Sequence, residues 1–288
     1  MINEYKKILT CDDIELNVLI HEEGHNDWLI HLHDYGEHHG RHQHVLDQAS
    51  RFQNIIQVDL RGHGDSGGDL SKIRDFRILT RDLDDVIHFL KKEYSLSSYS
   101  LMGHGVSGLI ICDYIQNFAK KDLYPNKVFL VGPLLFLHGS IGQLLSYTEK
   151  YIFSALDKIT INFSIPNFID PKKLSHDGRI FQSYCYEDNV ETSISSHFLY
   201  KLLKTARDVN SRPLRANCQL SIAMGGEDHL INVGLTEDYF NRFERGSKIL
   251  VVDGAYRELQ HEVEMFRYPY EDFLKNSLFD EKFSMKLL

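Results

Sequence analysis

The segment Leu101-Met102-Gly103-His104-Gly105-Val106-Ser107-Gly108 decides the fold of this chain. It connects an apolar run, residues 99–102, to an apolar stretch predicted to be helical, residues 106–118, through a Gly-His-Gly turn. A strand followed directly by a helix is the repeating unit of sheets whose strands run parallel. The segment therefore predicts an α/β protein.

Similar units lie on both sides of this segment. Residues 81–94, for example, carry apolar side chains at helical spacing between two predicted strands. This alternation predicts a mostly parallel sheet with helices on both faces. The strands are predicted from short apolar or β-branched runs at residues 14–21, 28–33, 55–60, 99–102, 127–131, 220–224 and 248–252.

The turn at Gly105 has the setting of a nucleophile elbow. In the motif G-x-S-x-G a serine stands at a sharp turn between a strand and a helix, where its hydroxyl is exposed for reaction. Here the middle position is Gly105, so the turn is kept and the hydroxyl is absent. Glycine enters the left-handed backbone region that such a turn requires almost without strain.

Further motifs extend the pattern along most of the chain. They are the stretches His33-Asp34-Tyr35-Gly36-Glu37-His38-His39-Gly40-Arg41, Asp59-Leu60-Arg61-Gly62-His63-Gly64-Asp65-Ser66-Gly67-Gly68, Gly225-Gly226-Glu227-Asp228 and Gly254-Ala255-Tyr256-Arg257-Glu258. With the elbow, they resemble the ordered motifs of α/β-hydrolases of the monoacylglycerol lipase and lysophospholipase branch, which is serine aminopeptidase S33-like. The resemblance implies an eight-stranded, mostly parallel sheet flanked by helices, with an inserted helical cap. Residues 1–133 and 218–288 are expected to form the core, and residues 134–217, rich in aromatic side chains, the cap.

The resemblance also implies which residues stand at the catalytic positions. Gly105 occupies the position of the nucleophile, Asp228 that of the acid, and Arg257 that of the histidine base. Tyr35 and Val106 would supply the backbone N–H groups of the oxyanion hole. A serine triad needs a hydroxyl, an imidazole and a carboxylate, and an arginine remains protonated at any ordinary pH. The triad is therefore predicted to be degenerate.

Two more residues are expected to line the site. Asp34 stands where the family has glycine, and its carboxylate beside the oxyanion hole would oppose a developing oxyanion. His104 lies in the elbow, at a position that packs in the family. We also expect Arg257 to form a bidentate ion pair with Asp228 in place of the link between aspartate and histidine.

A relocated catalytic group or a metal is the alternative. Ser107 is rotated by about 200° from Gly105 on a helix and should face the interior. His261 follows Arg257 by one helical turn, about 6 Å away. His38 and His42 have the i, i+4 spacing of metal ligands; the favoured interpretation is that they are structural or solvated histidines, with no metal and no cofactor.

Composition sets the remaining expectations. The chain of 288 residues carries a net charge of −9, which argues against nucleic-acid partners. It has no apolar run long enough to span a membrane and no secretory signal in residues 1–12, and its four cysteines are scattered, so a cytoplasmic location is expected. Two hypotheses follow. The first is a pseudoenzyme that binds an acyl or other apolar ligand or a protein partner, and the second is an active esterase or lipase that uses relocated residues or a bound metal.

Overall fold

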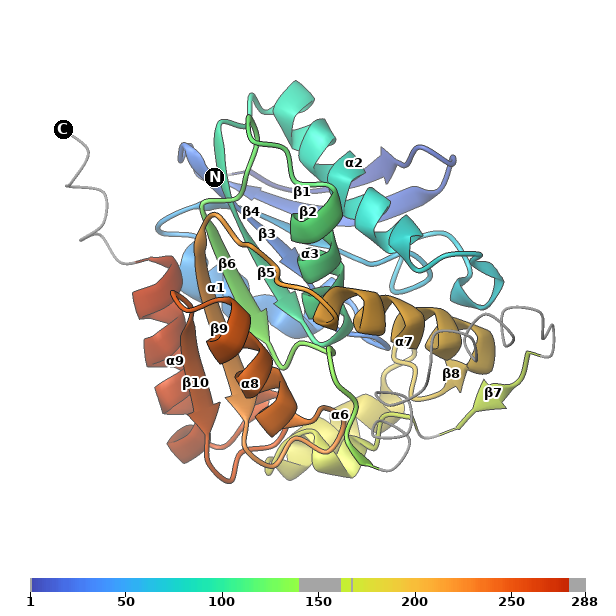
Figure 1. Cartoon of the computed structure of the whole chain (residues 1–288). Coiled ribbons are helices and arrows are strands. Elements are labelled where there is room, and N and C mark those ends of the chain that lie inside the picture. Colours follow the sequence, from blue (N-terminus) through green and yellow to red (C-terminus); the bar gives the residue numbers. More distant parts are fainter. Residues whose placement is uncertain (1, 140–161, 167, 280–288) are drawn as a thin grey trace.

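A single twisted sheet forms the centre of the molecule (Figure 1). The structure is a computed structural model and describes residues 2–139, 162–166 and 168–279. The sheet has eight strands in the order β1-β2-β4-β3-β5-β6-β9-β10. The strands are β1 (Ile2–Leu9), β2 (Glu15–Glu22), β3 (Asp27–Leu32), β4 (Asn54–Val58), β5 (Ser98–His104), β6 (Lys127–Val131), β9 (Gln219–Gly225) and β10 (Lys248–Val252).

The strand pairing is parallel from β4 to β10, whereas β2 is antiparallel to both of its neighbours. The expectation of an eight-stranded, mostly parallel sheet is therefore confirmed. Each predicted run corresponds to a strand, but the edge strand β1 was not predicted. Two of its apolar side chains, Tyr5 and Leu9, are 66% and 62% exposed. Apolar residues thus stand on the solvent face of β1 as well as on its buried face. The alternation of apolar and polar residues by which a half-buried strand is recognised is therefore absent.

Helices cover both faces of the sheet (Figure 1). One apolar core lies between the sheet and α2 (Arg77–Glu93), α3 (Val106–Asn117) and α8 (Val233–Phe243). A second core lies on the opposite face, under α1 (Gln43–Ala49) and α9 (Glu264–Leu278). None of the helices within the described residues is long and apolar enough to cross a membrane.

The described part of the chain between β6 and β9 lies beyond the carboxyl ends of the strands (Figure 1). Its described elements are β7 (Ser164–Ile165), η3 (Pro171–Lys173), α6 (Gly178–Tyr186), β8 (Ile194–Ser195) and α7 (Ser196–Asn210). Two aromatic side chains of this region, Tyr184 and Phe198, are buried and pack against the main core. Part of the predicted cap, residues 140–161 with Tyr147, Tyr151 and Phe153, lies outside the described residues.

Close backbone packing joins the loops that follow β9 and β10. Gly225 ends β9, and a Cβ atom built on it would lie 1.8 Å from the carbonyl oxygen of Tyr256, which is beyond β10. Only a glycine permits this approach. It brings the loop of Asp228 next to the loop of Arg257.

We expect Gly225→Ala to destabilise the protein by about 2–3 kcal/mol, because overpacking against backbone forces strands and loops apart. Gly246→Ala is the matched control, since nothing lies within 4 Å of the Cβ position there; its free energy of unfolding should change by no more than about 0.5 kcal/mol. Urea denaturation of both variants measures the difference. Equal effects would contradict the packing described here.

Candidate active site

The elbow is built as the sequence predicts. Gly105 follows β5 and caps the N-terminus of α3 with φ +51° and ψ −109°. Its N–H donates to the carbonyl oxygen of Val131 on β6 at 2.9 Å. Ser107 is fully buried, and its hydroxyl donates to the carbonyl oxygen of His33. Ser107 therefore faces the interior, as its rotation on the helix predicts, and it has no access to a substrate.

The two predicted oxyanion-hole N–H groups converge on one atom of the protein itself. The N–H of Tyr35 and that of Val106 each donate to Oδ1 of Asp34, both at 2.7 Å. In an α/β-hydrolase this pair of donors, one after the nucleophile and one in the loop after the third strand, stabilises the oxyanion. Oδ1 of Asp34 therefore occupies the point on which the two predicted oxyanion-hole N–H groups converge, rather than lying beside it.

Arg257 holds the other oxygen of that carboxylate. Its Nε and Nη2 atoms donate to Oδ2 of Asp34 at 3.0 and 2.5 Å. Burial alone would lower the pKa of Arg257, but the carboxylates of Asp34 and Asp228 raise it above its ordinary value. The guanidinium thus stays charged, and it cannot accept a proton from a nucleophile.

Asp228 completes the chain of charges. Its Oδ2 accepts a hydrogen bond from Nη1 of Arg257 at 3.1 Å, and its Oδ1 accepts from the backbone N–H groups of Leu230 and Ile231 at 2.8 and 3.1 Å. The predicted contact between Arg257 and Asp228 is present. The predicted bidentate geometry was wrong, because the fork of the guanidinium faces Asp34 and only one nitrogen remains for Asp228.

Gly105 has a second role at this place. A Cβ atom built on it would lie 1.9 Å from Oδ1 of Asp34. Any side chain at the nucleophile position would therefore displace that carboxylate. The glycine at 105 and the aspartate at 34 are compatible with each other, whereas serine and this placement of aspartate are not.

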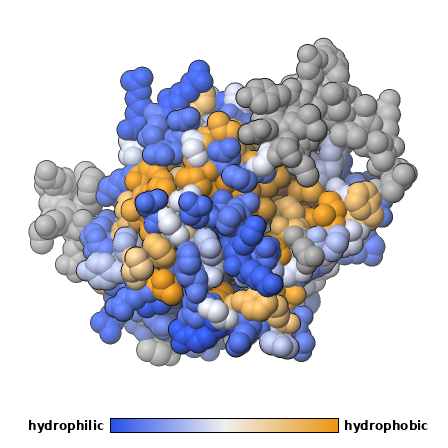
Figure 2. All heavy atoms as spheres, turned by 90° about the horizontal axis from the view of Figure 1, so that it is seen from below, coloured by the Kyte–Doolittle hydropathy of each residue, from blue (hydrophilic) through white to orange (hydrophobic). Residues whose placement is uncertain are grey.

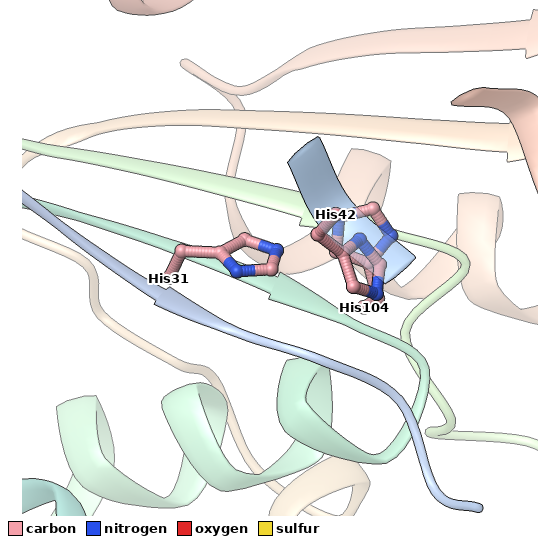
Figure 3. Close-up of side chains that lie close together, drawn as sticks. All are labelled: His31, His42 and His104. Carbon is pink, nitrogen blue, oxygen red and sulfur yellow. The ribbon is translucent and has the colours of Figure 1, made fainter. Parts of the chain in front are cut away.

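His104 belongs to a group of buried histidines, not to the site above. His31 on β3 and His104 at the end of β5 point to the same place as His42 of η1 (His39–His42) (Figure 3). These three offer ligand nitrogens within 4.8 Å of one another. His38, which the spacing paired with His42, falls instead in a second group with His39 and Asp59. Sequence reasoning missed His31 because it lies in a strand, far from any metal-binding motif.

His261, the alternative candidate for a base, is held by contacts with the protein. Its Nδ1 pairs with Oε2 of Glu258 at 2.6 Å, and its Nε2 donates to the carbonyl oxygen of Arg41 at 3.0 Å. Arg41 itself binds Oε2 of Glu187 at 2.7 Å and lies over the ring of Tyr184. Arg41, for which the sequence suggested no role, therefore ties α6 to the core.

Comparison with known proteins identifies the family of the chain. Residues 24–264 match the family described as serine aminopeptidase, S33. The monoacylglycerol lipase of Mycolicibacterium smegmatis is 24% identical over 238 residues, which cover 81% of each chain. The monoglyceride lipase of Rattus norvegicus is 27% identical over 204 residues, which cover 69% of this chain and 64% of the rat protein.

Solved structures are similar over nearly the whole chain. The monoacylglycerol lipase of Paleococcus ferrophilus superposes with a TM-score of 0.72 at 20% identity, covering 96% of this chain and 100% of that one. A soluble variant of the monoglyceride lipase of Saccharomyces cerevisiae, in complex with a substrate analog, gives 0.76 at 17% identity and covers 96% and 94%. The sheet, its elbow and these similarities define an α/β-hydrolase fold. The chain belongs to the serine aminopeptidase S33 family, in the branch that contains the monoglyceride lipases.

A double-mutant cycle between Asp34 and Gly105 tests the crowding. We expect Gly105→Ala to cost at least about 3 kcal/mol in the native chain, as backbone strain and displacement of the carboxylate add. In an Asp34→Gly background only the strain remains, so the cost should fall by at least about 1 kcal/mol. Gly24→Ala is the control, because Gly24 also has a positive φ, +82°, and nothing lies within 4 Å of its Cβ position. Its cost should not depend on residue 34, and additive effects of Asp34 and Gly105 would contradict the geometry.

Acid should unfold the metal-free protein through the buried histidines. Burial, reinforced by neighbouring imidazoles, lowers the pKa of His31, His42 and His104 well below the ordinary value. Below about pH 6.5 the unfolded chain then binds more protons than the folded one, so stability falls with falling pH. In EDTA we expect a loss of roughly 2–4 kcal/mol between pH 6 and 5, and His31→Leu should reduce the slope by about 1.4 kcal/mol per pH unit. Denaturant titrations at each pH measure the free energy of unfolding. A free energy of unfolding that does not change between pH 6 and 5 would contradict the neutral state of these buried histidines.

Proposed function

We propose that this chain is a non-catalytic member of its family, with the catalytic positions at Gly105, Asp228 and Arg257 and the oxyanion positions at Tyr35 and Val106. One observation carries the proposal: Oδ1 of Asp34 accepts hydrogen bonds from both N–H groups that an oxyanion would need. A substrate carbonyl cannot be polarised there while this carboxylate remains. Catalysis of acyl transfer depends on those donors by about 10²–10³-fold for each one.

The replaced positions form one interdependent set. The carboxylate of Asp34 has room because residue 105 has no side chain, and its charge is balanced because residue 257 is an arginine. Restoring Gly105→Ser alone would create a clash, and restoring Arg257→His alone would remove a buried countercharge. Such coupling explains why three departures from the family occur together at a single site.

The three candidates for a relocated nucleophile or base do not serve the elbow. Ser107 and His261 are held by hydrogen bonds to the protein, and His104 lies within the buried histidine group. The hypothesis of an active hydrolase with relocated residues therefore gains no support from the geometry. It remains an outcome that the assay below would reveal.

The retained function in this proposal is binding, with residues 134–217 as a cap over the strand ends. The face of the molecule seen from below carries hydrophobic surface between hydrophilic patches (Figure 2). Ligand pockets are lined mainly by apolar and aromatic side chains, so an acyl or other apolar ligand, or a protein that presents an apolar segment, suits this face. The yeast monoglyceride lipase was solved in complex with a substrate analog, which supports a small-molecule ligand for this chain.

Hydrolysis of p-nitrophenyl butyrate and of a monoacylglycerol tests the proposal. We expect no turnover above the buffer rate from the native chain, and turnover higher by at least about 10³-fold from the variant Asp34→Gly/Gly105→Ser/Arg257→His. The third substitution is needed because serine at 105 and aspartate at 34 compete for one place. The matched control, Gly105→Ser/Arg257→His with Asp34 kept, should stay inactive.

Circular dichroism establishes that each variant is folded before its rate is compared. Turnover by the native chain that persists after repeated purification would disprove the loss of catalysis. An inert but folded triple variant would show that activity was lost at more than these positions.

A further inference from the structure

The buried histidines lie on a face of the sheet that is otherwise apolar. Leu29 on β3 and Met102 on β5 belong to the core under α1 and α9. Side chains two residues apart along a strand point to the same face, so His31 and His104 continue these two rows. His42 meets them from η1, at the start of the layer that covers this face (Figure 3). Three polar rings thus stand where a core would use aliphatic side chains.

One buried nitrogen of each ring is left without a partner. His31 and His42 are fully buried and His104 is 4% exposed. Nε2 of His31, Nδ1 of His42 and Nε2 of His104 are buried and make no hydrogen bond. A buried polar atom without a partner is costly and rare, and its presence calls for a water, an ion or a functional role. Three such atoms on one group of rings indicate a shared partner.

We propose that His31, His42 and His104 bind a divalent transition-metal ion of the zinc class. Three imidazoles are a common ligand set for zinc, with Zn–N distances of about 2.0–2.1 Å. Tetrahedral ligands at that distance lie about 3.3 Å apart. The ligand nitrogens here lie within 4.8 Å of one another, so small rotations of the rings suffice to close the set around one ion.

The protonation state fits this ligand role. Burial keeps all three imidazoles neutral near pH 7, because it lowers the pKa of each ring. Metal ions bind only the neutral form.

The three rings also lie close together. The ring centroids are 4.6 Å apart for His31 and His42, 4.6 Å for His42 and His104, and 5.3 Å for His31 and His104.

A carboxylate orients His42 as in many metal sites. Nε2 of His42 donates to Oε2 of Glu37 at 2.9 Å, which leaves the lone pair of Nδ1 free for an ion. Metal-bound histidines usually donate their second nitrogen to such a carboxylate. His31 has no such carboxyl partner: its Nδ1 lies 3.5 Å from the amide nitrogen of Gln57, at the limit of a hydrogen bond, so this contact does not fix the tautomer of the ring.

The second histidine group of the chain lacks these features. Nδ1 of His39 pairs with Oδ1 of Asp59 at 2.8 Å, and Nε2 of His38 pairs with Oε1 of Glu187 at 2.6 Å. Nδ1 of His38 accepts from the N–H of Gly40 at 3.2 Å. The ring nitrogens named here have hydrogen-bond partners within the protein. A substitution in this second group therefore serves as a control for the metal-binding experiments.

The role of the ion is structural. His44, near the start of α1, has both nitrogens buried and unpartnered, and its ring centroid is 5.5 Å from that of His42, so it is the nearest candidate for a fourth ligand. Four protein ligands leave no open position for water, and sites of that kind stabilise rather than catalyse. This site therefore does not supply the hydrolysis that the elbow lacks.

Refolding tests the proposal, because a buried site is loaded as the chain folds. The full chain is unfolded in guanidinium, refolded with ZnCl₂ or with EDTA, and desalted; zinc is then measured by mass spectrometry and thermal stability by circular dichroism. We expect about one equivalent of zinc and a higher melting temperature in the zinc sample, because an ion that binds only the folded state stabilises it. Refolding with Co²⁺ should give the visible absorption of tetrahedral cobalt with nitrogen ligands.

Variants locate the ion. His31→Leu and His104→Leu suit the apolar surroundings and should fold without metal, while the zinc content falls at least about tenfold and the cobalt absorption disappears. His38→Gln in the second group should leave both unchanged. Less than about a tenth of an equivalent in the native chain, or zinc lost in His38→Gln and kept in His31→Leu, would overturn the proposal. If the leucine variants fail to fold, the zinc content of His42→Gln and the cobalt spectrum of the native chain test the proposal instead. Zinc kept in His42→Gln, or no tetrahedral cobalt absorption in the native chain, would overturn it. None of these measurements involves ester hydrolysis, so they are independent of the proposed function.

Discussion

The hydrogen bonds from Tyr35 and Val106 to the carboxylate of Asp34 are the interaction on which the rest of the site depends. A buried carboxylate is unfavourable unless its charge and both oxygens are compensated. Here one oxygen receives two backbone donors and the other receives the guanidinium of Arg257. Val106 also opens α3, so the positive end of that helix faces the charge. With this compensation the site is stable without substrate.

The donors that favour catalysis in this fold also favour the buried carboxylate of Asp34. An elbow and the loop after the third strand present two N–H groups that stabilise negative charge. They do not distinguish a transient oxyanion from a permanent carboxylate at the same place. Once glycine stands at 105, an aspartate at 34 fills the position and an arginine at 257 neutralises it. Interactions of the kind that can serve a reaction thus hold this site together, as expected where function lies in a site and not in the fold.

Glu37 links this site to the histidines on the other face of β3 and β5. Its Oε2 accepts from the N–H of Asp34 at 3.2 Å and from Nε2 of His42 at 2.9 Å. The carboxyl group of Glu37 thus holds both the backbone at Asp34 and the orientation of His42. Polar networks of this kind are rigid when every member is satisfied, and the histidine nitrogens are the members that still lack partners.

The sequence by itself determined the succession of strands and helices, the glycine elbow and the positions of Gly105, Asp228 and Arg257 in the family order, because periodicity and motif spacing are local properties of the chain. It did not reveal β1, whose exposed Tyr5 and Leu9 hide the alternation. Only the tertiary structure decided where the carboxylate of Asp34 points. Its partners Val106 and Arg257 are 72 and 223 residues away, and such contacts depend on strand order. The histidine group likewise exists only because β3 and β5 pair in parallel and turn His31 and His104 to one face.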